Sequence, residues 1–437
     1  MERARNRTAA MDKGAIMNSY FKQENLKTLE DYFRNGCKLN CIQKLGMEIE
    51  HIIVHKGTRK AVTYYEDHGI GWLLAQLKSY YPHFIHEQDN LLGLFNADYS
   101  ISLEPAAQFE VSIAPREDIR TIMRIYRSFL NIIQPILDQE GYELWNIGYQ
   151  PESQVDDLPL IPKKRYRYMD RYFRTSGTRG RNMMRGTAAT QISIDYCSEE
   201  DFVRKYRTAY LIMPAIRLLT DNTPMFEGKP WPGHLVRTKI WDNVDPKRCG
   251  SPDGLFDDNF SFHTYAEYLW NMPPVMKPED GDFVFSGEDR VSDIWGEKRM
   301  TPEDVEHIIS MTFVDVRLKN YVEIRGADSM PAEYMKAYLA LVKGVFFQSE
   351  VAKDLLSRYH VTIEDIHKAN QSLSRDGYQG KIYGVPADQF TGELLEMAKD
   401  HLTNEEEKFL DPFILLVNQK TTLAAEYQKK NLRRILK

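Results

Sequence analysis

The stretch Gly46-Met47-Glu48-Ile49-Glu50-His51-Ile52-Ile53-Val54 decides the fold. It is apolar and rich in β-branched residues, which predicts a buried β-strand. Because successive side chains of a strand point to opposite faces, Glu48 and Glu50 share one face. Two neighbouring buried carboxylates repel each other unless a cation holds them, and a hard divalent cation is the natural occupant. An exposed strand with a solvated acidic face is the alternative that this stretch alone leaves open.

Composition narrows the class of protein. The chain has 437 residues, 42% of them hydrophobic, and a formal net charge of −6. It is long enough for a large core, and its acidic balance argues against a protein that coats nucleic acid. Few cysteines, without the paired spacing of a zinc site, favour structural thiols in a reduced, cytoplasmic compartment. No run approaches the ~20 apolar residues of a membrane span. The cysteines are Cys37, Cys41, Cys197 and Cys249.

No repeat or linker divides the chain. Residues 1–16 are charged and lack a hydrophobic signal core, which predicts a disordered extension, or residues from a start codon assigned too early, rather than a targeting signal. We expect one catalytic unit over 17–437, with a sheet core that carries the active site at 17–330 and a helical portion at 331–437. Apolar residues at helical spacing predict helices over 17–36, 117–140, 200–219, 334–347, 351–359, 363–373, 391–401 and 404–436.

Residues 99–112 predict a second strand with acids on one face. Glu104, Gln108 and Glu110 have the same parity, so they line one face if the strand stays in register. Pro105 favours an edge or a bulge. Glu110 therefore carries more weight than Glu104.

Two later stretches repeat the alternation. Residues 187–196 place Gln191 on a polar face, opposite isoleucines. Residues 314–326 predict a fourth strand, whose polar face is mostly charged and whose other face is almost wholly apolar. A turn-rich segment that carries Arg237, Trp241 and Arg248 lies between them. The polar face of the fourth strand holds Arg317, Lys319, Tyr321, Glu323 and Arg325.

The most basic stretch of the chain runs from Lys163 to Arg185, with tyrosines interleaved. Out of context, this pattern indicates a nucleic-acid surface. The stretch stands alone in an acidic protein and leads directly into a predicted strand. A loop that handles phosphate over an active site fits equally well, because arginine is suited to clamp phosphate and carboxylate oxygens.

The four strands together predict an α+β fold, in which helices back an antiparallel sheet. Several acids on its front, with arginines beside them, indicate a site for magnesium and nucleotide phosphates. No Walker A sequence or Rossmann glycine fingerprint occurs, so the sheet and loops must form any nucleotide site. A solvated front face remains the competing explanation.

Five motifs in this order resemble the glutamate–cysteine ligase family, in particular its branch shared by plants and many bacteria. They span residues 46 to about 330, and the helical C-terminal portion resembles the family only in general character. The motifs are Gly-x-Glu-x-Glu at 46–50, Leu-Glu-Pro-x-x-Gln-Phe-Glu at 103–110, Met-Met-x-x-Thr-x-x-x-Gln at 183–191, Arg-x-x-x-Trp-x-x-x-Asp at 237–245 with Arg248, and Val-Arg-Leu-Lys-x-Tyr-x-Glu-x-Arg-Gly-Ala-Asp at 316–328.

The resemblance implies a curved antiparallel sheet that forms a funnel, like the catalytic half of glutamine synthetase. It also implies a reaction in which ATP phosphorylates the γ-carboxylate of glutamate and the amino group of cysteine attacks the acyl phosphate. Two or three Mg²⁺ ions would offset the repulsion between the phosphates and the carboxylate.

The resemblance also assigns roles to individual residues. The implied metal ligands are Glu48, Glu50, Glu104, Glu110 and Glu323. Arg325 would contact the transferring phosphate, and Arg237 and Arg165 would hold a substrate carboxylate or phosphate. Further residues for substrate or ATP are Gln191, Arg248 and Arg317, with Tyr168 and Trp241 shaping the amino-acid pockets or packing in the core.

This chain departs from the family pattern at three places: Ala106–Ala107 replace a usual Gly-Gly, Arg185 lies one position early, and Ser193 stands where several members have Asn. The alternatives are a ligase with another amine acceptor, a nucleic-acid-binding protein that uses residues 163–185, and a metal-dependent hydrolase. For the ligase, we expect small-molecule partners only, with no nucleic acid and no membrane, in a monomer or homodimer.

Overall fold

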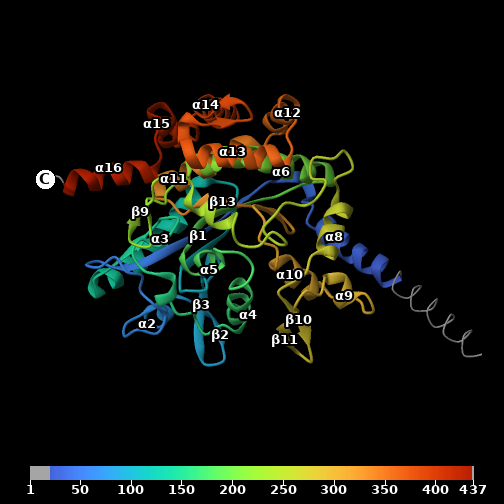
Figure 1. Ribbon diagram of the computed structural model, residues 1–437, viewed down its shortest axis with the longest axis horizontal. Coiled ribbons are helices and arrows are strands. Elements are labelled where there is room, and N and C mark those ends of the chain that lie inside the picture. Colours follow the sequence, from blue (N-terminus) through green and yellow to red (C-terminus); the bar gives the residue numbers. More distant parts are fainter. Residues whose placement is uncertain (1–19, 436–437) are drawn as a thin grey trace, which may run out of the picture.

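The structure is a computed structural model that describes residues 20–435 (Figure 1). Within them, a nine-stranded antiparallel sheet forms the centre of the molecule, with strand order β12-β13-β7-β1-β5-β4-β3-β2 and β6 pairing with β1. The strands are β1 (Leu45–His55), β2 (His83–Glu87), β3 (Asn90–Phe95), β4 (Tyr99–Leu103), β5 (Phe109–Arg116), β6 (Tyr142–Trp145), β7 (Ala189–Ile194), β12 (Val316–Leu318) and β13 (Val322–Asp328). The disordered extension predicted for 1–16 lies outside the described residues.

The strand predicted from residues 46–54 is β1, and it lies in the middle of the sheet. On β1, Glu48 is directly opposite Gln191 of β7 and Ser112 of β5, and Glu50 is opposite Glu110. Side chains of opposite residues lie on the same face. The register therefore gathers the polar side chains of three strands on one face.

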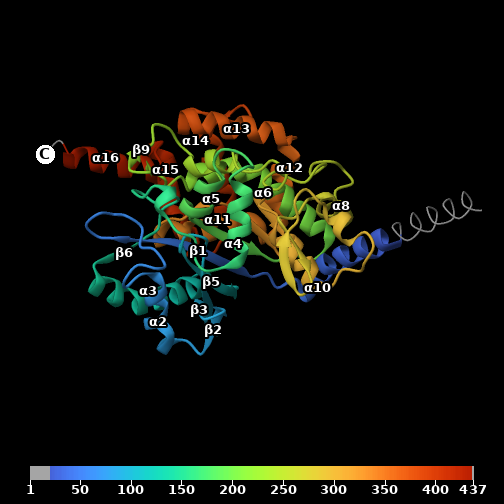
Figure 2. The ribbon, with the colours of Figure 1, turned by 60° about the horizontal axis from the view of Figure 1, so that its bottom comes forward.

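Helices cover the apolar face of the sheet. In the described part of the chain, α6 packs on β13, α11 on β7 and α3 on β5. Figures 1 and 2 show α12, α13, α14 and α15 farther out on this side of the molecule. One buried hydrophobic cluster includes side chains of the sheet and of the C-terminal helices. The helices named so far are α3 (Ile119–Glu140), α6 (Glu199–Leu219), α11 (Ala332–Phe346), α12 (Ser349–Arg358), α13 (Ile363–Asp376), α14 (Ala387–Lys399) and α15 (Asp411–Gln419).

The remaining elements are shorter or lie at the periphery. Residues 20–35 form a helix. The other described α-helices are α2 (Ile70–Leu77), α4 (Lys164–Phe173), α5 (Gly180–Gly186), α7 (Val236–Trp241), α8 (Phe262–Asn271), α9 (Val291–Trp295), α10 (Pro302–Ser310) and α16 (Leu423–Ile435). Three two-stranded hairpins complete the fold: β8 (Met225–Phe226) with β9 (Lys229–Pro230), β10 (Met276–Glu279) with β11 (Asp282–Phe285), and β14 (Lys381–Ile382) with β15 (Val385–Pro386).

Two predicted strands are hairpins. Residues 99–112, in which Pro105 favoured an edge or a bulge, form β4 and β5 around a turn in which Ala107 has a left-handed φ of 70°. Residues 314–326 likewise divide into β12 and β13, because the chain reverses around Asn320 and the Lys319 N–H donates to the Tyr321 carbonyl at 2.8 Å. In both places the polar side chains still share one face of the sheet.

Three further predictions were wrong. The turn-rich segment contains α7 at Val236–Trp241. The helix expected over 404–436 is interrupted at Lys420, which has a φ of 50°. Cys197 is disulfide-bonded rather than a thiol, whereas Cys37 and Cys249 are free. None of the described helices is long and apolar enough to cross a membrane.

Candidate active site

The polar face of the sheet opens into a cavity of about 280 Å³, which we call the reaction cavity. Residues from β1, β5, β7, β12 and β13 line one side of it, and residues of α4, α5 and α7 line the other. All but two of the predicted site residues lie here: Glu48, Glu50, Glu104, Glu110, Arg165, Gln191, Arg237, Trp241, Arg317, Glu323 and Arg325.

Four carboxyl groups form one wall of the reaction cavity. Glu50 accepts hydrogen bonds from the Ala189 N–H at 2.9 Å and from Gln191 Nε2 at 3.0 Å. Glu110 accepts one from Ser102 Oγ at 2.6 Å. The other two carboxyl groups of this wall belong to Glu48 and Glu104.

The positive charge near this wall does not offset the burial and mutual repulsion of its carboxyl groups. Burial, and then the neighbouring Glu110 and Glu323, raise the pKa of Glu48 to about 8. Burial and Glu104 raise the pKa of Glu110 to about 7. The pKa of Glu50 also rises well above its usual value, through burial and then through Glu104 and Glu110. Burial raises the pKa of Glu104 as well, although nearby cationic side chains oppose the rise. The wall therefore favours a bound cation.

Positive charge surrounds the carboxylate of Glu323, which is fully buried. Its carboxylate accepts from Arg317 Nε at 2.8 Å and Nη2 at 3.2 Å, and from Arg325 Nη1 at 2.8 Å, while Lys319 Nζ lies 3.9 Å away. Burial alone would raise the pKa of Glu323, but these three cations hold it well below its ordinary value. Glu323 is thus neutralised by protein groups.

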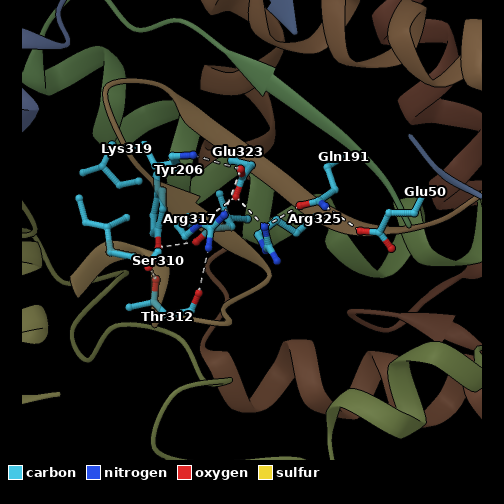
Figure 3. A network of polar contacts seen from close by, with 12 residues as sticks. Glu50, Gln191, Tyr206, Ser310, Thr312, Arg317, Lys319, Glu323 and Arg325 are labelled. Carbon is cyan, nitrogen blue, oxygen red and sulfur yellow. Dashed lines mark hydrogen bonds and ion pairs between the residues drawn. The ribbon is translucent and has the colours of Figure 1, made fainter. Parts of the chain in front are cut away.

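Gln191 connects the two regions. Its Oε1 accepts a hydrogen bond from Arg325 Nη1 at 2.6 Å, and its Nε2 donates to Glu50. Figure 3 shows this continuous path from Glu50 through Gln191 and Arg325 to Glu323 and Arg317. A charged group that binds at Arg325 therefore acts on a network that reaches the carboxylate wall.

Two further arginines face the reaction cavity from outside the sheet. Arg165 of α4 donates to Ser310 Oγ at 3.1 Å and to its carbonyl at 2.8 Å. Arg237 of α7 donates to the Arg325 carbonyl at 3.2 Å, and its guanidinium lies 5.7 Å from the Trp241 ring centre. Burial lowers the pKa of both arginines. They are suited to bind a substrate carboxylate or phosphate, because buried guanidinium groups gain from an anionic partner.

Two predicted residues lie elsewhere. Arg248 is fully buried and donates to Tyr172 Oη at 2.5 Å and to Asp245 Oδ2 at 2.7 Å, away from the reaction cavity. Tyr168 does not line the reaction cavity, because the side of α4 that faces it carries Arg165, Tyr166 and Met169. The spacing of these three is helical. Recognising residues 164–173 as a helix would have found Tyr166, which sequence reasoning missed together with Lys163 and Ser310.

Part of the basic stretch is paired with acidic side chains within the protein. Arg185 is buried and forms an ion pair with Asp170 at 2.5 Å, and Arg174 binds the same carboxylate at 2.8 Å. Arg181 pairs with Asp156. These contacts stabilise α4 and α5 over the reaction cavity, so part of the positive charge on which the hypothesis of a nucleic-acid surface rests is used within the protein.

A buried sheet face that sets carboxylates beside arginines is typical of enzymes that handle phosphate groups with the help of cations. A family model described as "Glutamate-cysteine ligase family 2 (GCS2)" matches residues 44–427, so the chain belongs to this family. It is 29% identical over 383 residues to "Glutamate--cysteine ligase, chloroplastic" of Medicago truncatula, an alignment that covers 86% of this chain and 75% of that protein. It is 32% identical over 327 residues to "Glutamate--cysteine ligase B, chloroplastic" of Oryza sativa subsp. japonica, covering 73% and 65%.

A solved structure has the same fold. It is a glutamate–cysteine ligase from Francisella tularensis in complex with AMP, and it superposes with a TM-score of 0.56 at 12% identity, covering 90% of this chain and 85% of that one. The predicted α+β fold with an antiparallel sheet is confirmed.

Proposed function

We propose that the protein uses ATP to join the γ-carboxylate of L-glutamate to the amino group of L-cysteine, giving γ-glutamylcysteine, ADP and phosphate. The observation that carries the proposal is the reaction cavity, in which a cation-poor carboxylate wall lies beside a row of arginines. Family membership and the names of the relatives support the same reaction.

The residues of the reaction cavity fit this chemistry. A carboxylate is a poor electrophile, and its phosphorylation supplies a leaving group. Arg325 is fixed by Glu323 and Gln191, so its guanidinium is preorganised to contact the transferring phosphoryl group. Arg237 and Arg165 line the reaction cavity and would hold a substrate carboxylate or phosphate.

Magnesium is part of the proposal. The carboxyl groups of Glu48, Glu50, Glu104 and Glu110 fit it, because burial and mutual repulsion raise their pKa values. No group of three or more His, Cys, Asp or Glu within residues 20–435 is arranged to hold a metal by itself. Mg²⁺ in nucleotide-dependent enzymes is usually held by one or two carboxylates together with nucleotide phosphates, and we propose the same arrangement here. When bound, Mg²⁺ would neutralise charge on the phosphates.

Measuring phosphate release tests the proposal. The assay follows release from Mg-ATP with L-glutamate across a panel of amine acceptors that includes L-cysteine. We expect turnover that requires both glutamate and cysteine, and its loss in Glu48→Gln. Turnover with glutamate and a different amine would keep the ligase reaction and change the acceptor. Glutamate-independent hydrolysis of a phosphate ester, or no turnover at all, would overturn the proposal.

The cytoplasmic location and the oligomeric state, monomer or homodimer, are likewise proposals. The few cysteines are the support for a reduced compartment, although Cys197 is disulfide-bonded and the relatives are named chloroplastic. Size-exclusion chromatography with light scattering measures the oligomeric state directly.

A further inference from the structure

A charged pair outside the reaction cavity lies at the start of α7, the helix that carries Arg237. Nδ1 of His234 is 3.3 Å from Oδ2 of Asp221, and the Leu235 N–H donates to Asp221 Oδ1 at 3.2 Å. The Asp221 side chain is fully buried, whereas that of His234 is 28% exposed. A buried carboxylate is costly unless it is hydrogen-bonded and paired with a cation. Asp221 therefore favours the imidazolium form of His234, in which both ring nitrogens carry a proton.

This pair holds the first turn of α7 in place. Leu235, which directly precedes α7, has a left-handed φ of 54°, and its apolar side chain cannot cap the helix. Asp221, which follows α6, supplies the acceptor for the Leu235 N–H instead. The backbone of His234 is also fixed, because its N–H donates to the Ser374 carbonyl of α13 at 3.0 Å. Since α7 has six residues, these contacts at its start strongly affect where its side chains lie.

Residues 221–223 also hold β13, the strand that carries Arg325. Within this segment, a backbone N–H and a threonine hydroxyl donate to Asp328 Oδ2 at 3.0 and 2.7 Å. Asp328 is the last residue of β13. In the reaction cavity, α7 and β13 meet where Arg237 Nη2 donates to the Arg325 carbonyl. The same short segment thus fixes α7 and β13 relative to each other, and the contact of Asp221 with His234 belongs to the half that holds α7.

We propose that the His234–Asp221 ion pair positions α7, and with it Arg237, in the reaction cavity, and that this positioning weakens when His234 loses its proton. His234 is a positioning residue, because it acts through α7 and does not line the reaction cavity. Its effect on turnover rests on the proposed function, in which Arg237 holds a substrate group. Its effect on α7 itself does not depend on which reaction the protein catalyses.

The groups around His234 give the direction of the pH dependence. The hydrogen bond from Asp221 raises the pKa of His234, and the charges of Asp221 and Asp376 add to the rise, although partial burial opposes it. Asp376, the last residue of α13, is itself paired with Arg375 at 2.7 Å. Burial also raises the pKa of Tyr378, near Asp221, so this phenol stays neutral. Because the folded protein raises the pKa of His234 above 6.5, the ion pair is complete below pH 6.5 and is lost as the pH rises through the raised value.

Hydrogen–deuterium exchange of the full chain tests the effect on α7. Exchange of peptides that contain α7 is followed by mass spectrometry at pH 6 and pH 9, corrected for the intrinsic rate and normalised to α11. His234→Asn keeps a neutral donor close to the position of Nδ1 but cannot become charged. His68→Asn is the matched control, because His68 Nδ1 also pairs with a carboxylate, that of Glu140 at 2.7 Å, and His68 does not line the reaction cavity.

The ratio of kcat/KM for glutamate between the unmodified chain and each variant, over the same pH range, tests the effect on the reaction cavity. Titrations that the proteins share, such as that of Glu48, cancel in this ratio. A residue that only stabilises the fold would give a ratio that is the same at every pH.

At pH 6 we expect α7 to exchange about fivefold faster in His234→Asn than in the unmodified chain, as for the loss of a charge-assisted hydrogen bond in favour of a neutral one. At pH 9 the two should agree within about twofold, and the ratio of kcat/KM should fall from about five to about one. In the unmodified chain, α7 exchange should rise about fivefold between pH 6 and pH 9, a measurement that needs no variant. His68→Asn should match the unmodified chain throughout.

Equal α7 exchange in His234→Asn and the unmodified chain at pH 6 would overturn the proposal. So would a difference in α7 exchange that is the same at both pH values, or a ratio of kcat/KM that does not change with pH. If the unmodified chain shows no glutamate-dependent turnover, the proposed function fails instead, and α7 exchange alone then decides whether the ion pair positions the helix.

Discussion

Replacing Glu48 by Gln keeps the size of the side chain and removes its charge. The change in the free energy of unfolding then measures how much the buried charge of Glu48 destabilises the folded protein. The pKa of Glu48 in the folded protein is about 8, against 4.5 as its ordinary value. Each pKa unit corresponds to about 1.4 kcal/mol, so ionising Glu48 in the folded protein costs at most about 5 kcal/mol. Some of this cost is shared, because Glu110 can hold the proton instead. We expect Glu48→Gln to stabilise the fold by about 1–3 kcal/mol at pH 8.

The sign follows from the direction of the shift. Below the unfolded value of 4.5 both states are protonated at Glu48 and the cost is absent. As the pH rises above 4.5, the unfolded state releases its proton first, so the folded state loses relative stability until about pH 8. The gain from Glu48→Gln should therefore be under about 1 kcal/mol at pH 5 and largest at pH 8.

Urea unfolding followed by circular dichroism, at pH 5, 6, 7 and 8 in EDTA, measures the gain. Glu117→Gln, at an exposed position, is the control and should change nothing. Adding Mg²⁺ at pH 8 should stabilise the unmodified chain more than the variant, because the ion offsets the charge that Glu48→Gln removes. A variant that is no more stable than the unmodified chain at pH 8, or whose gain is the same at pH 5, would refute the reasoning.

Three further substitutions test other parts of the site. Arg325→Met should lower the rate of ATP turnover by about 10²–10³-fold, with partial recovery in Arg325→Lys, measured by phosphate release; a loss below about threefold would remove Arg325 from the reaction. Arg185→Met breaks the buried pair with Asp170 and should lower the free energy of unfolding by about 3 kcal/mol in urea; a loss below about 1 kcal/mol would contradict the structural role given to this pair. Ala107→Gly relieves a left-handed backbone conformation and should raise stability by about 1 kcal/mol, seen as a higher thermal midpoint; an unchanged or lower midpoint would count against strain there.

The sequence predicted which side chains meet but not how the chain brings them together. Parity along the strands placed Glu48, Gln191 and Glu323 on one face, and the register confirms this arrangement. Parity survived the two unpredicted hairpins because each turn returns the chain antiparallel beside the preceding strand, where the polar side chains remain on the same face.

The residues whose positions were not predicted from the sequence lie in helices and loops, where side chains do not alternate between two faces. Residues 163–185 were interpreted from their high positive charge, so the helical spacing of Arg165, Tyr166 and Met169 was not recognised. Arg248 belongs to one of the motifs on which the family resemblance was based, yet in the structure its contacts are within the protein. A motif shows that a residue matters, and only its contacts show whether it binds a ligand or stabilises the fold.

The carboxylates of the reaction cavity differ in whether cationic side chains of the protein neutralise them. This difference constrains which form of a nucleotide can bind beside them. The carboxylate of Glu323 is already neutralised by arginines, whereas those of Glu48, Glu50 and Glu110 are not. A polyphosphate alone would bring more negative charge to a wall whose carboxyl groups are not neutralised by the protein, so its binding there would be opposed. A polyphosphate that carries divalent cations meets the carboxylates through those cations and the arginines through its oxygens. Under the proposed function, this arrangement of charges would favour a metal–nucleotide complex over a free nucleotide, and Arg325, which is linked to Glu50 through Gln191, would lie where the two interactions meet.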